Sequence, residues 1–320
     1  MKIWLSYIFI LLSVAVSAQQ LPVHSGNNLN PYLYNPAVGG YKPYIDFRLQ
    51  HKSQWLGVKG SPSTQLLSAH SSIDKKKYGL GGYVYNDRAG VLSNTGLSLS
   101  YSYHINITEK TKLSFGLSGS VAQYRINRNK VILVHDEDPL VNVSNTANTI
   151  APNAGAGLFL YKQDRFYLGI SGLNLLPFKI DYQTNSVTPQ VAHIYFIASK
   201  NIFVGESISL QPTALLNYIG SNPFMADFRL KLDYNELYQI ELGYRLKDGI
   251  IAGFGIYPHP DFGIHYNYNL SLTTLRTGNF GSHEIMLNYI FYYKPDYKKV
   301  RRRYKWIDTR QRKSDPDGQD

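Results

Sequence analysis

Residues Leu92 to Tyr124 read LSNTGLSLSYSYHINITEKTKLSFGLSGSVAQY, and this stretch decides the fold. Apolar or aromatic side chains alternate with small polar ones over residues 97–107, and again over residues 113–121. A period of two residues is typical of β-strands and does not fit one face of a helix. The polar run from Thr108 to Thr111 separates the two halves, so the stretch predicts a β-hairpin.

The two faces of this hairpin indicate its surroundings. One face is apolar or aromatic, whereas the other holds serine, glycine, histidine and asparagine. Strands of about ten residues with such faces match the tilted spans of an outer-membrane barrel, which has a lipid-facing surface and a polar interior. The 27 tyrosines and 14 phenylalanines in 320 residues fit the aromatic girdles that such barrels carry at both membrane interfaces.

The same alternation recurs along the chain and predicts twelve strands besides the hairpin. They cover residues 45–50, the run up to 73, 79–87, 152–162, 165–175, 190–202, 207–219, 226–235, 237–246, 249–257, 262–273 and 283–293. The predicted fold class is therefore all-β: a transmembrane antiparallel β-barrel of about fourteen strands. An even number of strands places both chain ends on the periplasmic side of a closed barrel.

Charged residues in the C-terminal half predict the contents of the barrel. They alternate with apolar residues, and an Arg or Lys that faces lipid at the bilayer midplane costs about 2–4 kcal/mol, so they face inward. We expect cross-strand pairing, either as ion pairs that fill the interior or as a selectivity lining. The expected partners are Arg229, Lys231, Glu241 and Arg245 with Asp227 and Asp233.

The two ends of the chain differ from the barrel. Residues 1–18 have a lysine, an apolar run and a small-residue cleavage site before Gln19, which predicts a secretory signal peptide. The chain has no cysteine, so neither a lipobox nor a disulfide is expected. Residues 294–320 form a predicted basic tail, in which residues 298–313 hold nine Lys or Arg and one Asp, a net charge of +8 out of +11.

Residues 19–43 precede the first predicted strand of a barrel that covers residues 44–293. They contain the steps Asn30-Pro31 and Asn35-Pro36 and the pair Gly39-Gly40. Proline after asparagine disfavours helix and favours an extended or turn geometry. We expect this segment to be a loop or a plug packed in or under the barrel.

Three motifs resemble the PorP/SprF family, outer-membrane proteins of the Bacteroidetes type IX secretion and gliding machinery. The resemblance continues in the same order over the mature barrel. The matching residues are Asn30, Asn35, Pro36, Ala37 and Gly40 in the first motif; Gln54, Trp55, Gly57, Gly60, Pro62 and Thr64 in the second; and Asn86, Asp87 and Gly90 in the third.

The resemblance implies a function in protein export. Family members look like outer-membrane partners of large surface proteins, such as gliding adhesins, that the type IX system exports. It also implies periplasmic ring components as partners, and the tail residues Arg301, Arg302, Arg303, Lys305 and Trp306 are candidates for docking on them or for adsorbing to outer-membrane lipids. Nucleic acid is excluded by compartment. The alternative is a general diffusion porin or a hydrophobic-solute channel.

No catalytic, cofactor or metal site is expected. The sequence has no nucleophile elbow, no His-Glu-x-x-His motif, no phosphate loop and no dinucleotide fingerprint. The run from His135 to Asp138 contains oxygen ligands but lacks the spacing and turn glycine of a calcium loop, so a solvated acidic loop is favoured over a cation site.

Overall fold

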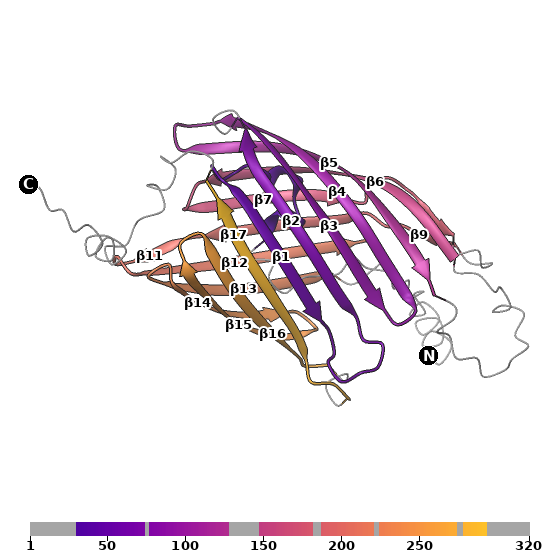
Figure 1. Cartoon of the computed structure of the whole chain (residues 1–320). Helices are drawn as coiled ribbons and strands as arrows, with labels where there is room; N and C mark the ends of the chain where they lie inside the picture. The colour runs from indigo at the N-terminus through magenta and orange to yellow at the C-terminus, as the bar shows by residue number, and fades with distance from the viewer. Residues whose placement is uncertain are drawn as a thin grey trace, which may run out of the picture.

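The computed structural model describes residues 30–73, 77–127, 147–181, 187–220, 224–273 and 278–292. Within these ranges, fourteen antiparallel strands form a barrel (Figure 1). They are β1 (Ile45–Ser53), β2 (Ser63–Ile73), β3 (Tyr78–Ala89), β4 (Leu92–Asn106), β5 (Thr111–Ile126), β6 (Ala147–Lys162), β7 (Phe166–Leu173), β10 (His193–Lys200), β12 (Ile208–Ile219), β13 (Met225–Tyr234), β14 (Tyr238–Arg245), β15 (Gly249–His259), β16 (Phe262–Ser271) and β17 (Ser282–Phe291).

Two pairings close the barrel. β1 pairs with β17, with Leu49 opposite Leu287, and β10 pairs with β12, with Ile197 opposite Leu215. Every barrel strand therefore has a neighbour on both sides, and its backbone N–H and C=O groups find partners within the sheet. This closure is what lets strands cross hydrocarbon, where an unpaired backbone group costs several kcal/mol. The prediction of a fourteen-stranded antiparallel barrel is confirmed.

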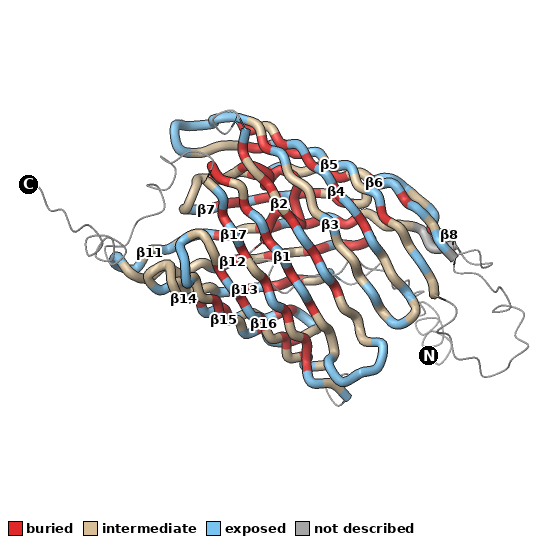
Figure 2. The backbone as a smooth tube through the Cα atoms, in the orientation of Figure 1, coloured by how far each residue is buried: buried red, intermediate tan, exposed pale blue. Residues whose placement is uncertain are grey.

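Burial alternates along the barrel strands as predicted, and Figure 2 shows buried and exposed positions following one another along them. On β4, Ser98, Ser100 and Ser102 are buried, whereas Leu99 and Tyr101 are exposed on the outer surface. The outer face is thus apolar and the inner face polar, which is the reverse of a water-soluble sheet. Among the described residues, no helix is long and apolar enough to cross a bilayer.

The two ends of the barrel differ in the length of their connections. At one end several turns are short, and they cover residues 107–110, 163–165, 235–237 and 260–261. We call this the short-turn end. β1 begins and β17 ends there. At the other end, here the long-loop end, the connections between β1 and β2, β5 and β6, and β7 and β10 are longer.

The connection between β7 and β10 contains a small two-stranded sheet. It consists of β8 (Lys179–Asp181) and β9 (Val187–Pro189). Ile180 is buried against Tyr124 and Ile126, which lie on a part of β5 that extends beyond the predicted strand. This apolar contact holds the small sheet against β5. A further strand, β11 (Ile202–Val204), pairs with the start of β12.

The face alternation makes a prediction about membrane depth. Leu99 is 61% exposed at the centre of β4, so Leu99→Arg should destabilise the inserted barrel by about 2–4 kcal/mol. Ser93→Arg, on the same face near the strand end, should cost about 0–1 kcal/mol. Equilibrium unfolding from lipid vesicles measures both. Equal costs at the two positions would contradict the assigned lipid face.

Candidate functional site

Residues 30–44, here the plug segment, lie inside the barrel. Residues 30–40 are all buried and include two 3-10 turns, η1 (Pro31–Leu33) and η2 (Pro36–Val38). Each turn starts at a proline, whose fixed φ suits the first helical position and whose missing N–H is not needed there. The turn η2 contacts β4, β5 and β6 from within.

Asn35 fastens the plug segment to the barrel wall. Its Oδ1 accepts a hydrogen bond from the Ala37 N–H (2.9 Å), which caps η2. Its Nδ2 donates to the carbonyls of Leu158 on β6 (2.9 Å) and Ile170 on β7 (3.2 Å). The side-chain amide supplies the acceptor and the donors for all three bonds, so an aspartate or a serine at this position would lose part of the set.

A second anchor holds the carbonyl of Gly39. The Ser102 hydroxyl donates to this oxygen (2.6 Å), and His104 Nε2 lies 2.9 Å from it. His104 Nδ1 lies 3.0 Å from the Tyr161 hydroxyl. With Nε2–H donating to the carbonyl, Nδ1 accepts a hydrogen bond from the Tyr161 hydroxyl, and the neutral imidazole bridges the wall and the plug segment.

The start of the plug segment is fixed in the same way. Asn30 Nδ2 donates to Ser68 Oγ on β2 (3.0 Å), and the Tyr32 hydroxyl lies 2.7 Å from Ser100 Oγ on β4. Burial raises the pKa of the Tyr32 hydroxyl above its ordinary value, so this group stays neutral. Polar contacts therefore reach the plug segment from several strands of the wall.

Inward-facing glycines provide the space in which the plug segment sits. A Cβ atom at Gly116 would overlap the backbone of Ala37, and one at Gly81 would lie 2.6 Å from the Tyr32 hydroxyl oxygen. The glycines of this kind on β3, β5 and β6 are Gly79, Gly81, Gly116 and Gly157. The wall is shaped to the plug segment, because any larger side chain at these positions would push it away.

The other half of the interior holds the predicted ion pairs. Both Arg229 and Arg245 donate to the carboxylate of Asp227 (2.6–2.9 Å), and Arg229 also binds Glu241 (2.6 Å). Lys231 lies 3.2 Å from Asp233. The pairs Arg229–Glu241 and Arg245–Asp227 join β13 and β14 as predicted, whereas Arg229–Asp227 and Lys231–Asp233 lie within β13. Buried charges are tolerated only when they are paired and hydrogen-bonded, as the two arginines are here.

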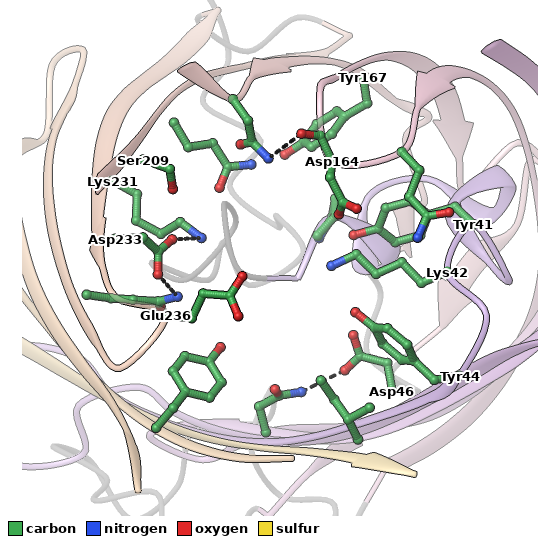
Figure 3. A pocket seen from close by; sticks show the side chains of 18 of the residues that line it. Tyr41, Lys42, Tyr44, Asp46, Asp164, Tyr167, Ser209, Lys231, Asp233 and Glu236 are labelled. Atoms are coloured by element: carbon green, nitrogen blue, oxygen red, sulfur yellow. Dashed lines mark hydrogen bonds and ion pairs between the residues drawn. The ribbon is translucent and has the colours of Figure 1, made fainter. Parts of the chain in front are cut away.

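A polar cavity of about 200 Å³ opens at the short-turn end (Figure 3). The residues that line it include Pro31 and Lys42 of the plug segment and the turn residues Asp164 and Glu236. We call this cavity the vestibule. The side chains that line it carry charges of both signs. It ends against the plug segment.

The second motif forms the turn between β1 and β2 at the long-loop end. The Gln54 N–H donates to the Pro62 carbonyl (2.8 Å) and closes the turn. Trp55, Gly57 and Gly60 all have positive φ values, of 48°, 96° and 76°. Glycine reaches this region without strain, which explains its presence at two of the three positions.

The third motif is joined to the second in space. The Gly90 N–H donates to the Gly60 carbonyl (2.8 Å), and the Thr64 hydroxyl donates to Asp87 (2.5 Å). The Asn86 side chain accepts from Thr95 on β4 (3.0 Å). The residues of these two motifs therefore build one rigid corner of the long-loop end, here the motif corner.

The structure thus brings the family-motif residues together in two places, the plug segment and the motif corner. Reasoning from sequence missed the groups that receive the plug segment, notably Ser102, His104 and Gly116. A signal for Gly116 was present, because it interrupts the serines on the inner face of its strand. The signal peptide, the basic tail and the His135 to Asp138 loop lie outside the described residues. The described ranges contain no group of three side chains that could hold a metal ion.

The comparison with protein families decides which family these features represent. The model of the type IX secretion system membrane protein PorP/SprF matches residues 16–289. The chain belongs to the PorP/SprF family. As a family member with this barrel, it is an outer-membrane protein of the type IX secretion system. A comparison with curated proteins found no match.

Solved structures similar to this PorP/SprF chain are outer-membrane channels. The Ralstonia pickettii toluene transporter TbuX is 10% identical, with a TM-score of 0.51 over 82% of this chain and 93% of the transporter. The monoaromatic hydrocarbon channel CymD is also 10% identical, with a TM-score of 0.50 over 85% of this chain and 94% of the channel. At such identity the likeness concerns the fold alone.

The fit between the plug segment and the wall makes a prediction. Gly116→Leu should overpack the interior and cost about 1–3 kcal/mol, lowering the temperature at which the barrel loses its folded gel mobility. Gly119→Leu is the matched control, because Gly119 lies on the same strand with open space on its outer side. Equal midpoints for the two variants would contradict the tight seating.

Proposed function

We propose that this barrel assists the secretion and cell-surface attachment of one dedicated exported protein, such as a gliding adhesin. The observation that carries the proposal is the plug segment, which is anchored across the interior and seated on glycines. An interior so occupied, with ion pairs in its other half, leaves little room for a passing solute. Membership of a secretion family then favours a role exerted through the ends of the barrel.

The alternative is a general diffusion porin or a hydrophobic-solute channel. The fold of the structural neighbours is compatible with it, and the vestibule is an aqueous entrance at one end. The plug segment argues against it, because the vestibule ends there. The two functions differ in the process that requires the barrel. The first requires it for the display of a surface protein, and the second for the uptake of small solutes.

Deletion of the gene tests the proposal. It should remove one surface protein, or a small set, from the cell surface, while other cargo of the type IX system is still exported. Surface proteomics of intact cells measures this. Unchanged surface proteins together with a loss of small-solute uptake would instead establish the channel.

We also propose that the short-turn end faces the periplasm. Outer-membrane barrels have short periplasmic turns and longer extracellular loops. Residues 44 and 292 lie at the short-turn end, so both termini are proposed to be periplasmic. In the same scheme residues 1–18 are a signal peptide, residues 19–43 a plug, residues 44–293 the barrel and residues 294–320 a periplasmic tail.

The orientation can be tested with single cysteines, because the chain has none of its own. Lys59→Cys lies in the turn between β1 and β2 at the long-loop end, and Lys110→Cys lies in a turn at the short-turn end. A membrane-impermeant maleimide should label intact cells at residue 59 and not at residue 110. Labelling at residue 110 alone would show that the barrel has the opposite orientation, with the short-turn end outside the cell.

The basic tail is proposed to dock on periplasmic ring components of the type IX system through Arg301, Arg302, Arg303, Lys305 and Trp306. Truncation after Lys294 should leave folding and membrane insertion intact, while abolishing co-purification with ring components and display of the surface partner. If the truncated chain still supports full display of the surface partner, the docking proposal is wrong, and the tail only adsorbs to anionic lipid headgroups.

A further inference from the structure

The outer face of the first strands changes character before the long-loop end. On β1 the outward residues Phe47 and Leu49 are followed by His51 and Ser53. The same change occurs on the neighbouring strands, where Leu67 on β2 gives way to Gln65 and Ser63, and Val84 on β3 gives way to Asn86 and Arg88. The hydrocarbon band therefore ends below this polar belt.

Large apolar side chains reappear beyond the polar belt. Leu56 is 46% exposed, Val58 is 43% exposed and Phe280 is 73% exposed. Leu56 and Val58 lie between the motif residues of the turn that joins β1 to β2, and Phe280 lies in the connection that leads into β17, at the same end of the barrel (Figure 1). We call these three residues the loop platform. They lie beyond the polar belt of β1, β2 and β3, on connections at the long-loop end.

Backbone contacts hold the loop platform in place. The Leu56 N–H donates to the Gly281 carbonyl (2.9 Å), and the Phe280 N–H donates to the Leu56 carbonyl (2.8 Å). The Phe280 ring lies against Gly57, where a Cβ atom would come within 2.8 Å of it. The motif residues thus act as a scaffold that presents three apolar side chains which are not motif residues themselves.

An ordered apolar surface in water is an interaction site. Exposed apolar patches with polar rims mark binding surfaces, and aromatic residues are enriched in the cores of protein interfaces. A surface that is already fixed loses little conformational freedom when a partner binds. The two backbone bonds therefore favour binding as well as order.

The charges around the loop platform define the chemistry of the partner. Over residues 54–62 and 86–89, the charged side chains are Lys59, Asp87 and Arg88. Asp87 accepts the hydrogen bond of Thr64, whereas Lys59 is exposed and Arg88 points outward. The rim is therefore cationic, and a complementary segment carries apolar anchors next to carboxylates.

We propose that the loop platform is the docking site on this barrel for the exported surface protein, through a segment with aliphatic or aromatic anchors flanked by acidic residues. The inference rests on the proposed function and on the proposed orientation. It specifies where on the barrel the exported protein binds and which residue types bind there. A cationic rim could also bind lipid phosphates, but phosphate binding gives no role to three exposed apolar side chains.

The experiment combines a charge variant with cross-linking in cells. The variant carries Leu56→Asp, Val58→Asp and Phe280→Asp together. The matched control is Phe224→Asp, because Phe224 is 47% exposed at the same end of the barrel, between β12 and β13 on the far side of the sheet order. The probe is the surface protein whose display is lost on deletion of the gene. A photoreactive benzoylphenylalanine at position 280 tests direct contact.

The expected result is a tenfold or greater loss of that surface protein in the triple variant, with barrel abundance and heat-modifiable migration unchanged. Phe224→Asp should display it normally, and residue 280 should cross-link to the same protein. Normal display in the triple variant would overturn the docking site while leaving the proposed function intact. Cross-linking of residue 280 to lipopolysaccharide alone would also overturn it. If deletion removes no surface protein, the proposed function itself fails.

Discussion

Closure of the sheet is the constraint on which the rest of the structure depends. In hydrocarbon no water can satisfy an unpaired backbone group, so the first strand must find the last, and β1 pairs with β17 along its whole length. Fourteen strands enclose a lumen wider than the side chains of the wall can fill. The chain fills it from two sources: the plug segment on one side, and the arginines and carboxylates of β13 and β14 on the other.

These two fillings solve the same physical problem differently. Arg229 sits in the interior because two carboxylates satisfy it, so its burial depends on charge pairing between neighbouring strands. The plug segment is held by hydrogen bonds to single atoms, such as the Gly39 carbonyl, and by the absence of side chains at glycines of the wall. The ion pairs are local to one hairpin. The plug contacts join residues that lie far apart in the sequence: 38 positions separate Asn30 from Ser68, and 123 separate Asn35 from Leu158.

That difference explains what could be predicted from the sequence. The fourteen strands, their inward and outward faces and the pairs around Asp227 follow from a period of two residues and from the cost of a charge in lipid. The tyrosines were assigned to girdles facing the membrane interfaces. Several of them, including Tyr161, Tyr167 and Tyr195, instead pack inside the barrel in the core around the plug segment. A strand pattern tells which face a residue occupies, but it does not tell which distant segment will cover that face.

The motif residues also show that a sequence pattern does not reveal which distant segments come into contact. Gly60 and Gly90 are thirty positions apart, and their shared role becomes visible only when the backbone bond between them is seen. The motif residues of the plug segment line the interior, and those of the motif corner hold the turn between β1 and β2 or bond a neighbouring segment. The side chains of Leu56 and Val58 are exposed instead. They project from a turn whose positive φ values Gly57 and Gly60 allow and whose backbone is held by hydrogen bonds. Residues of this kind can be replaced while the barrel that carries them stays the same, and the proposed docking of one dedicated surface protein depends on this separation between scaffold and contact residues.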